Sequence, residues 1–282
     1  MNIYIIIPAY NEEAFIAKTL QSLVEQTFLP KKIVVINDNS TDDTQNLIDS
    51  FSKKHSFISS ILNKSEAIHI PGSKVINAFN KGLESIDNNY DIICKFDADL
   101  IFPSNYLEQI KNTFEKSPDC GMAGGFCYLE KNNTWVLENL TNKEHIRGAL
   151  KAYRKQCFLQ IGGLKNTMGW DTVDELLAQY HGWKIHTDES LHVKHLKPTG
   201  KAYSKKPKYK QGEAFYKMRY GFWLTSIASV KLAFNKRNFL FFLHYMQGYF
   251  KAKTNNISFI VSEKEGLFIR KLRWGGIKKK LF

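Results

Sequence analysis

Two carboxylates separated by one small residue, Asp97-Ala98-Asp99, follow directly after the mainly apolar run Asp91-Ile92-Ile93-Cys94-Lys95-Phe96. Such a run is typical of a buried strand in a parallel sheet, and residues i and i+2 of a strand point to the same face. Open α/β sheets bind ligands at the carboxyl ends of their strands. Two carboxylates there suit Mg²⁺ or Mn²⁺, held together with a substrate's phosphates. About one such triplet is expected by chance in a chain of this length, so the flanking elements must support it.

The elements around this motif alternate between strands and helices. Apolar stretches predict strands at 2–7, 32–36, 57–62, the run up to residue 97, 120–128, 183–186 and 191–195. Helical spacing predicts helices at 16–24, 42–54, 72–86, 104–116, 148–161 and about 168–182, with a loop or short hairpin at 131–144. This alternation predicts an α/β fold with a doubly wound, mostly parallel, Rossmann-like sheet. The first strand ends would bring Asn11, Asp38 and Asp97 to one edge.

The composition of the 282 residues, with 43% hydrophobic and 13% aromatic, allows one large domain or a domain with an appendage. We expect an α/β domain at 1–200 and a basic, aromatic-rich helical region at 201–282. The cysteines stand singly, without metal-ligand spacing, which predicts reduced structural thiols in a cytosolic protein. The N-terminus predicts a first strand rather than a signal peptide, and no run reaches the roughly 18 apolar residues that span a bilayer.

The net charge of +13 comes from the C-terminal region. Residues 201–282 contain 19 Lys/Arg and three Asp/Glu, whereas residues 1–200 contain 21 and 24. A charged connector is expected at 205–210, followed by helices at about 212–234 and 238–251 that carry Phe222, Trp223 and the aromatic run 239–242. Short apolar helices flanked by Lys/Arg are typical of a membrane interface, and the polybasic end would be drawn to anionic lipid. The alternative is a helical cap or a dimer contact with a solvated basic face.

Four segments in order resemble the family-2 glycosyltransferases of the GT-A fold, over about residues 3–200. They are Pro8-Ala9-Tyr10-Asn11-Glu12, Ile36-Asn37-Asp38-Asn39-Ser40-Thr41-Asp42, Asp97-Ala98-Asp99 and an acidic cluster before Gly182-Trp183. The resemblance implies inverting transfer of a sugar from a UDP- or GDP-linked donor to a glycan or lipid-linked acceptor hydroxyl, with Mg²⁺ or Mn²⁺ as cofactor. With the basic tail, it implies surface polysaccharide or lipid-linked glycan synthesis by a peripheral protein at the cytoplasmic face of a membrane.

The resemblance also implies roles for single residues. The loop of Pro8, Ala9, Tyr10, Asn11 and Glu12 would line the nucleotide pocket. Asp38 would accept hydrogen bonds from the base or ribose, a role compatible with capping the helix that follows. Asp99 would be the direct metal ligand, with Asp97 and Ala98 near the ribose and the metal. Lys74 and Lys95 would approach the phosphates, although lysines at such positions are often solvated.

An inverting transfer needs a base that removes the proton of the acceptor hydroxyl. The family usually carries an acidic pair ahead of an Arg and a Gly, and this chain departs from that pattern. Trp170-Asp171 stands in that place, Asp174-Glu175 follows, and no Arg precedes Gly182. The distance to Gly182 favours Asp171 as the base, with Asp174 as the second candidate and Glu175 as an exposed residue of the first helical turn. Trp170 would either stack on a sugar or pack in the core.

A late histidine often supplies a further metal ligand in related enzymes, and imidazole suits divalent metals. His192 and His195 lie near the end of the last predicted strand. We favour His195 because the residues at 197–200 indicate an exit from the strand into a loop over the site. An exposed or core histidine is the alternative.

Three other functions compete with this interpretation. The basic, aromatic tail is compatible with a nucleic-acid-binding protein, but no recognised nucleic-acid motif accompanies it, and we expect no nucleic-acid partner. A sugar-nucleotide pyrophosphorylase would begin with a Gly-rich phosphate loop, where this chain has Pro8-Ala9-Tyr10-Asn11. A catalytically inactive sugar-nucleotide-binding module of the same fold is compatible with the irregular region around Asp171. The oligomeric state is left open.

Overall fold

The computed structural model describes residues 1–64, 73–138, 143–197 and 209–281. The expected start of a helix at residue 72, part of the loop expected at 131–144, the loop after residue 197 and most of the connector at 205–210 lie outside these residues. So does the predicted domain boundary at residue 200, which stays a prediction.

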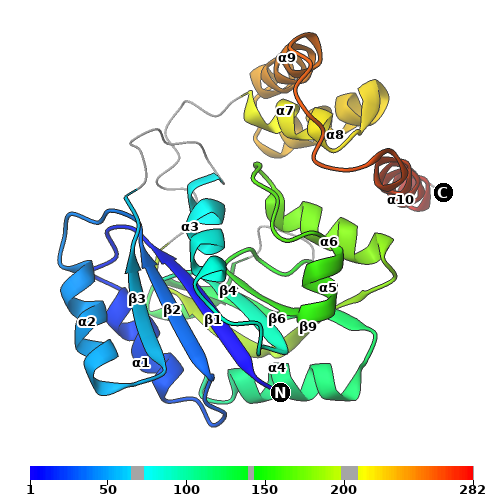
Figure 1. Cartoon of the computed structure of the whole chain (residues 1–282). Coiled ribbons are helices and arrows are strands. Elements are labelled where there is room, and N and C mark those ends of the chain that lie inside the picture. The colour runs from blue at the N-terminus through cyan, green and yellow to red at the C-terminus, as the bar shows by residue number, and fades with distance from the viewer. Residues whose placement is uncertain (65–72, 139–142, 198–208, 282) are drawn as a thin grey trace.

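Nine strands of the described residues form one sheet (Figure 1). They are β1 (Ile3–Ala9), β2 (Lys32–Asn37), β3 (Ile58–Leu62), β4 (Ile92–Phe96), β5 (Leu100–Ile101), β6 (Cys120–Lys131), β7 (Thr134–Leu137), β8 (Leu150–Arg154) and β9 (Lys184–His195). The helices of the sheet domain are α1 (Ile16–Val24), α2 (Thr44–Lys54), α3 (Ser73–Glu84), α4 (Tyr106–Lys116), α5 (Lys155–Gln160) and α6 (Trp170–Tyr180). The C-terminal helices are α7 (Lys210–Lys217), α8 (Gly221–Asn235), α9 (Leu240–Thr254) and α10 (Glu263–Leu281).

The order of the strands places the ends of β1, β2 and β4 side by side. β3, β2, β1 and β4 run parallel, and β8 then adds antiparallel to β4. β6 pairs antiparallel with β8 and parallel with β9, and the short β5 pairs antiparallel with β9. The predicted mostly parallel α/β sheet is therefore confirmed, with β8 running in the opposite direction near its middle.

The core lies around the central strands. β1 is buried over almost its whole length, as expected for a strand covered on both faces. α3 lies on β1 and β2 and approaches closely at Gly82, where an added Cβ would stand 2.6 Å from a side-chain carbon of Ile6. All four cysteines are buried and form no disulfide, which agrees with the expectation of reduced structural thiols.

The helix predicted at 148–161 is wrong in its first half. Residues 150–154 form β8, and only the short helix α5 follows. Pairing with the neighbouring strand overrides helical propensity here, because Ala152 lies opposite Cys94 of β4. The side chains of Lys151 and Tyr153 are fully buried, so this segment carries polar groups into the interior.

The two strands predicted at 183–186 and 191–195 are one strand, β9. Its pairing with β6 shifts register between Gly124 and Phe126, which lie opposite Thr187 and His192. The extra residues of β9 at this irregularity explain the two separate apolar patterns in the sequence. The segment at 131–144 begins with a hairpin between β6 and β7, one of the two forms expected. Its turn residues, Asn132 and Asn133, both have positive φ, as a tight hairpin turn requires.

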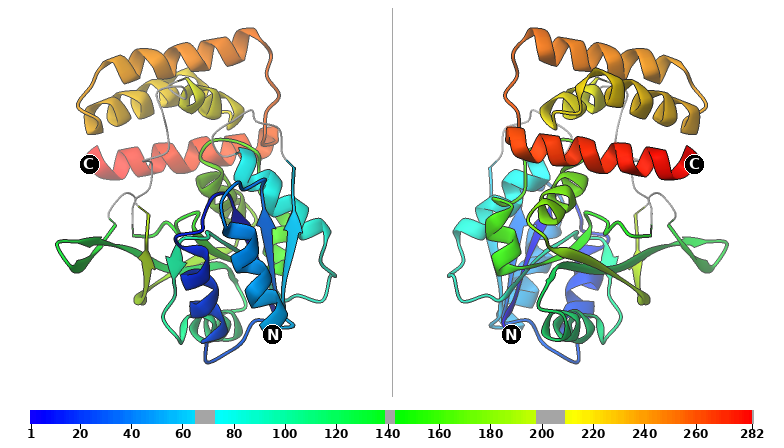
Figure 2. Two further views of the ribbon diagram at one scale, coloured as in Figure 1. Left: turned by 90° about the vertical axis from the view of Figure 1, so that its left-hand side faces the viewer. Right: turned by 90° about the vertical axis from the view of Figure 1, so that its right-hand side faces the viewer.

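The C-terminal helices form a separate layer stacked on the sheet domain, with α10 between that domain and the other helices (Figure 2). The single helix predicted at 212–234 is wrong, because the chain turns between α7 and α8 with positive φ at Arg219 and Gly221. Helix α10 was not predicted from the polybasic sequence. It is anchored to α6 by an edge-on ring contact between Phe268 and Tyr180, whose centroids are 5.6 Å apart. In the described part of the chain, no helix is both long and apolar enough to cross a membrane.

Candidate functional site

The Asp97-Ala98-Asp99 segment forms a turn between β4 and β5. The alternation of side chains along a strand therefore does not apply to the two aspartates, because the strand ends at Phe96. Thr19 of α1 stabilises the turn. Its hydroxyl donates to the carbonyl of Ala98 at 2.7 Å and accepts from the backbone N–H of Leu100 at 3.1 Å. This support keeps the segment in place at the carboxyl end of β4.

His195 lies between two carboxylates at the end of β9. Its Nδ1 is 2.9 Å from Glu138 Oε2, and its Nε2 is 3.5 Å from Asp99 Oδ2. The pairing of β5 with β9 produces this contact by placing Leu100 opposite His195. Burial alone would lower the pKa of His195, but the two carboxylates raise it to about 9. The structure thus brings together Asp99 and His195, two of the three residues predicted from sequence at the metal site.

The groups around Asp99 fit a divalent cation. Asp99 Oδ1 is buried and has no hydrogen-bond partner within the described residues, which leaves a carboxylate oxygen ready for a ligand. His195 Nε2 stands beside the other oxygen, and the partly exposed carboxylate of Asp97 follows β4 and forms an ion pair with Lys95. Carboxylate oxygens with one imidazole suit Mg²⁺ or Mn²⁺.

A second grouping shares His195 but is less suited to a metal. Cys127, Glu138 and His195 place ligand atoms within 4.8 Å of one another, and all three residues are buried. Burial raises the pKa of the Cys127 thiol to about 12, so the thiolate that binds metals is disfavoured. Glu138 is already paired with Arg147 at 2.6 Å. Glu138 therefore fits better as the carboxylate that orients the His195 ring, an arrangement common behind metal-bound histidines.

The loop after β1 and the turn after β2 are joined into one wall. Pro8 and Ala9 close β1, and the carbonyl of Ala9 accepts from the backbone N–H of Asp38 at 2.8 Å. Asn11, with φ of 51°, accepts from the backbone N–H of Thr41 at 2.9 Å. The buried side chain of Asp38 accepts from Asn63 at 2.7 Å. The predicted nucleotide-binding residues of these two segments therefore lie side by side.

Tyr10 and Lys74 contact each other on the open side of this wall. The Tyr10 ring is 56% exposed, and Lys74 Nζ lies 5.9 Å from its centre. A cation beside an exposed ring can receive a flat, negatively charged ligand. This contact places Lys74 beside the loop after β1, and its predicted approach to the phosphates stays a prediction.

Glu12 connects the loop after β1 to the end of β9. Its Oε1 is 2.7 Å from Lys197 Nζ, just beyond the end of β9. Burial raises the pKa of Glu12 against the opposing effect of Lys197, and the charges of Asp99 and Asp97 raise it further. Glu12 therefore ties the loop after β1 to Lys197 and lies within the electrostatic influence of Asp97 and Asp99.

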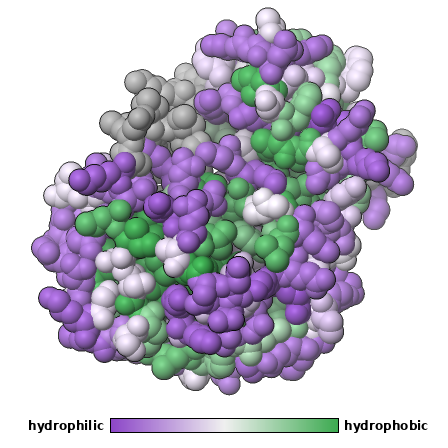
Figure 3. Space-filling view, viewed as in Figure 1, coloured by the Kyte–Doolittle hydropathy of each residue, from purple (hydrophilic) through white to green (hydrophobic). Residues whose placement is uncertain are grey.

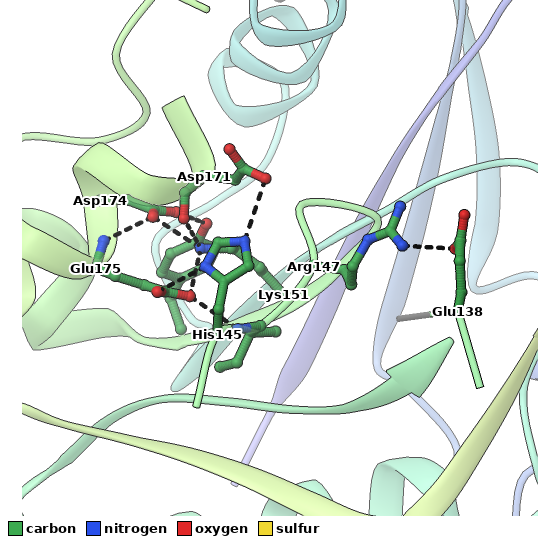
Figure 4. Close-up of polar contacts among 9 residues, drawn as sticks. Glu138, His145, Arg147, Lys151, Asp171, Asp174 and Glu175 are labelled. Atoms are coloured by element: carbon green, nitrogen blue, oxygen red, sulfur yellow. Dashed lines mark hydrogen bonds and ion pairs between the residues drawn. The ribbon is translucent and has the colours of Figure 1, made fainter. Parts of the chain in front are cut away.

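Asp171, in the first turn of α6, is contacted by a histidine that sequence reasoning did not identify (Figure 4). His145 Nε2 lies 3.5 Å from Asp171 Oδ2, and its Nδ1 lies 2.8 Å from Glu175 Oε2. Burial would raise the pKa of Asp171, but His145 and the charge of Lys151 lower it to about 2. Burial would likewise lower the pKa of His145, whereas the two carboxylates raise it to about 9. Asp171 is therefore ionised at neutral pH, with 31% of its side chain exposed.

Asp174 lies deeper, in a fully buried group of charges. Lys151 Nζ is 2.8 Å from Asp174 Oδ1 and 3.0 Å from Glu175 Oε1, and the hydroxyl of Tyr153 donates to Asp174 Oδ2 at 2.5 Å. Neither Lys151 nor Asp174 is exposed at all. The expectation that Glu175 is an exposed residue of the first turn is wrong, because it points inward to Lys151 and His145. The side chains of this group converge between β8 and α6 (Figure 4).

Trp170 connects the two carboxylate clusters. Its ring lies 5.4 Å from Lys95 Nζ, which pairs with Asp97, and 5.9 Å from Lys151 Nζ. Trp170 is 7% exposed, so of the two roles expected for it, packing fits better than stacking on a sugar. Lys95 is buried as well, which makes it a partner of Asp97 rather than a solvated lysine.

Sequence reasoning missed Glu138, His145 and Lys151. Glu138 stands in the polar segment 131–144 that was expected to be a loop or hairpin, and His145 follows directly after it, where a single residue gives no signal. Lys151 fell in a predicted helix, where a lysine is normally exposed. The alternation of Lys151 and Tyr153 along β8 could have indicated a strand with buried polar groups.

A comparison with known families identifies the class of protein. The family model described as Glycosyl transferase family 2 matches residues 4–168, more than half of the chain. A probable glycosyltransferase of Bacillus subtilis, YdaM, is 38% identical over 98 residues, which cover 34% of this chain and 22% of that protein. A poly-beta-1,6-N-acetyl-D-glucosamine synthase of Staphylococcus epidermidis is 26% identical over 196 residues, or 64% of this chain and 45% of that protein. The matches span less than half of either relative.

The fold is shared with solved glycosyltransferases. The mannosyltransferase PcManGT of Pyrobaculum calidifontis, solved with GDP-Man and Mn²⁺, superimposes with a TM-score of 0.60 at 16% identity, covering 100% of this chain and 81% of that one. At this identity the likeness shows the fold alone, which confirms the GT-A fold expected from the sequence.

The buried cluster predicts a large loss of stability when its cation is removed. Lys151→Met leaves Asp174 and Glu175 without their partner, which is expected to cost about 3–5 kcal/mol of unfolding free energy. Urea denaturation measures this loss. Lys184→Met is the matched control, because its pair with Asp119 is largely exposed (75% and 51%), and it should leave the unfolding midpoint unchanged. Equal effects of the two substitutions would contradict the proposed role of Lys151.

The raised pKa of His145 predicts a pH-dependent contribution to stability. A group whose pKa is higher in the folded state stabilises the fold fully below its unfolded pKa of about 6.5 and loses this effect as pH rises through the folded pKa. The stability difference between wild type and His145→Gln should therefore be on the order of 1–3 kcal/mol below pH 6.5 and shrink as pH rises through about 9. Urea titrations across this range measure it. The pH-dependent contribution of His195 is the same in both proteins and cancels in the comparison. A stability difference between wild type and His145→Gln that does not change with pH would refute the ion pairs of His145.

Proposed function

The chain belongs to glycosyl transferase family 2, and on that premise we propose that it is an inverting, metal-dependent glycosyltransferase. It moves a sugar from a nucleotide-diphospho-sugar to an acceptor hydroxyl. The observation that carries this proposal is the closeness of two carboxylate clusters, around Asp99 and around Asp171, which Lys95 and Trp170 connect. Inverting transfer requires a leaving-group site and a base on opposite sides of one sugar.

The donor nucleotide binds along the wall formed by residues 8–12 and Asp38. Asp38 offers a fixed carboxylate to the ribose or base, because Asn63 holds one of its oxygens. Tyr10 and Lys74 stand at the exposed side, where Lys74 contributes positive charge toward the phosphates. These contacts are compatible with UDP and with GDP, and a panel of UDP- and GDP-sugars distinguishes the two nucleotides.

Asp99, Asp97 and His195 would hold the cofactor, Mg²⁺ or Mn²⁺. When bound, the ion would neutralise the charge that develops on the diphosphate leaving group. The chain's own part is to keep these ligands in position: Thr19 supports the turn, Glu138 orients the His195 ring, and Lys95 holds Asp97. The buried, unsatisfied Asp99 Oδ1 is the atom that gains most from a ligand.

Asp171 serves as the base that accepts the proton of the acceptor hydroxyl. It is ionised and partly exposed, whereas Asp174 is fully buried between Lys151 and Tyr153 and out of reach of a substrate. His145 orients the Asp171 carboxylate through Nε2 while Glu175 holds the ring from the other side. Asp174 is therefore assigned a structural part, and Asp171 is the better of the two candidates.

The acceptor is a glycan or a lipid-linked glycan of a surface polysaccharide pathway. Support comes from one relative, named a poly-beta-1,6-N-acetyl-D-glucosamine synthase, and from the basic tail. Turnover of a panel of UDP- and GDP-sugars, with and without Mn²⁺, tests the activity as a whole. Tight donor binding without transfer or hydrolysis across the panel would instead favour a catalytically inactive sugar-nucleotide-binding module.

Substitution of Asp99, the proposed metal ligand, should weaken nucleotide binding without unfolding the protein. Asp99→Ala is expected to lower the Mn²⁺-dependent affinity for UDP or GDP by at least about tenfold, because the metal links the protein to the diphosphate. Calorimetric titration with Mn²⁺ and with EDTA measures this change. Asp119→Ala, an exposed carboxylate beside Lys184, is the control and should bind as the wild type does. Unchanged affinity in Asp99→Ala would refute the metal assignment.

The two aspartates of α6, Asp171 and Asp174, should differ in what their substitution impairs. Asp171→Asn should reduce turnover by at least roughly 10² while leaving nucleotide affinity near wild type, since only the proton acceptor is lost. Asp174→Asn should instead lower the unfolding midpoint. Steady-state kinetics and urea denaturation of both variants decide between them. A stable Asp174→Asn with the larger loss of turnover would transfer the role of base to Asp174.

A further inference from the structure

Helix α8 leaves several of its large apolar side chains exposed and buries mainly small ones. Its buried face carries Leu224 and the small side chains Thr225, Ser229 and Ala233, of which the small ones recur every four residues, and all four are at most 3% exposed. Its exposed face carries four large apolar side chains at helical spacing, Trp223 (71% exposed), Ile227 (40%), Val230 (51%) and Phe234 (81%). A water-soluble helix normally buries its large apolar side chains, whereas small residues at helix contacts and large apolar ones outside are typical of helices in lipid.

Helix α9 extends the same apolar surface. Phe239, Leu240, Leu243 and Phe250 are between 47% and 66% exposed. The two helices pack against each other, and the Phe250 ring lies 6.1 Å from that of Phe222, which in turn contacts Trp223. We call these exposed residues of α8 and α9 the apolar hairpin face. Apolar residues also reach the surface among hydrophilic ones in the part of this layer seen in Figure 3.

The inner side of α9 is already occupied, so the hairpin cannot turn its apolar face inward. Gly248 lies against α7, where an added Cβ would stand 2.1 Å from the carbonyl oxygen of Tyr209. Phe241, expected from sequence to insert with Phe239, is half-buried and packs against Tyr245. The exposed apolar side chains are therefore left over after the helices have made their own contacts.

The charges of the hairpin identify its partner. Residues 221–254 contain five Lys/Arg and no Asp/Glu. Lys236 and Arg237 stand at the turn between the helices, and Lys251 and Lys253 stand at the end of α9. Cations at both ends of an apolar face match a surface that is apolar inside and anionic at its boundary, because long basic side chains can reach the headgroups from a buried stem.

We propose that the apolar hairpin face inserts into one leaflet of an anionic bilayer, with α8 and α9 lying in the interface. Each helix has 15 residues, about 22 Å of length, which is shorter than the roughly 30 Å of a hydrocarbon core. The hairpin therefore lies on the membrane rather than across it. This inference does not depend on the proposed transferase activity.

The test uses the full chain with vesicles of phosphatidylcholine alone or mixed equally with phosphatidylglycerol. Deletion of residues 201–282 is a poor test, because Tyr220 and Ile269 belong to the same hydrophobic core as the sheet. The wild type should float with the anionic vesicles. The double variant Trp223→Ser/Phe234→Ser should bind at least about tenfold more weakly, because each large side chain contributes apolar area to insertion. Both residues are exposed in the protein alone, so the thermal midpoint should not change.

A matched control removes exposed apolar side chains from the sheet domain. Leu29→Ser/Leu159→Ser replaces residues that are 50% and 60% exposed, and it should bind vesicles as the wild type does. Lys236→Gln/Arg237→Gln should weaken binding to the anionic vesicles and reduce its salt dependence.

Three outcomes would overturn the proposal. One is full vesicle binding by the Trp223→Ser/Phe234→Ser variant, and a second is no binding by the wild type. The third is a dimer in vesicle-free buffer, seen by light scattering, that the same variant dissociates, because a second copy of the chain would then cover the face.

Discussion

A lysine side chain without solvent contact must have its charge matched inside the protein, because an isolated buried ammonium is strongly unfavourable. Lys151 of β8 meets this condition only when α6 places Asp174 and Glu175 beside it. The same helix begins with Trp170 and Asp171, so the charge match that holds α6 also positions the proposed base. Trp170 lies over Lys95 of β4, the strand that leads into Asp97. The buried cation Lys151 thus positions the proposed base and, through Trp170 and Lys95, is linked to Asp97 of the other half.

The two halves also share a local design. Each contains a histidine held between two carboxylates: His145 between Glu175 and Asp171, and His195 between Glu138 and Asp99. In both cases Nδ1 faces the more buried carboxylate, at 2.8 Å for His145 and 2.9 Å for His195. Nε2 lies 3.5 Å from the carboxylate assigned to the reaction, Asp171 or Asp99. The close contact fixes the ring, and the longer one leaves room for a proton or a metal ion. Glu175 and Glu138 thus fix the histidine rings, and each ring in turn orients the aspartate at its Nε2.

Much of the fold, and the closeness of Asp99 and His195, could be predicted from sequence because their signals are local. Apolar runs that end in polar residues identified β1, β2 and β4, and parallel strands must bring such ends together. The strand β8 was missed because its pairing with β4 and its charge match with α6 are contacts between distant segments, and the alternation of Lys151 and Tyr153 was the only local signal for it. His145 and Glu138 were missed for the same reason, since each acquires a role only when β9 or α6 arrives beside it. The exposed face of α8 could not be identified from the sequence either. Its apolar residues lie on most sides of the helix, and only the packing shows which of them remain exposed to solvent.

The charge distribution and the contacts of α10 constrain how the chain would meet a membrane. Residues 1–200 carry 21 Lys/Arg against 24 Asp/Glu, so an anionic surface attracts the tail and slightly repels the sheet domain. α10 ties these parts together: Arg270 donates to the carbonyl of Arg219 ahead of α8, and Phe268 contacts Tyr180 at the end of α6. The 11 residues of α6 span about 15 Å between Tyr180 and the turn that carries Asp171. A hairpin inserted in the bilayer would therefore be tied through α10 to the far end of the helix whose first turn carries the proposed base.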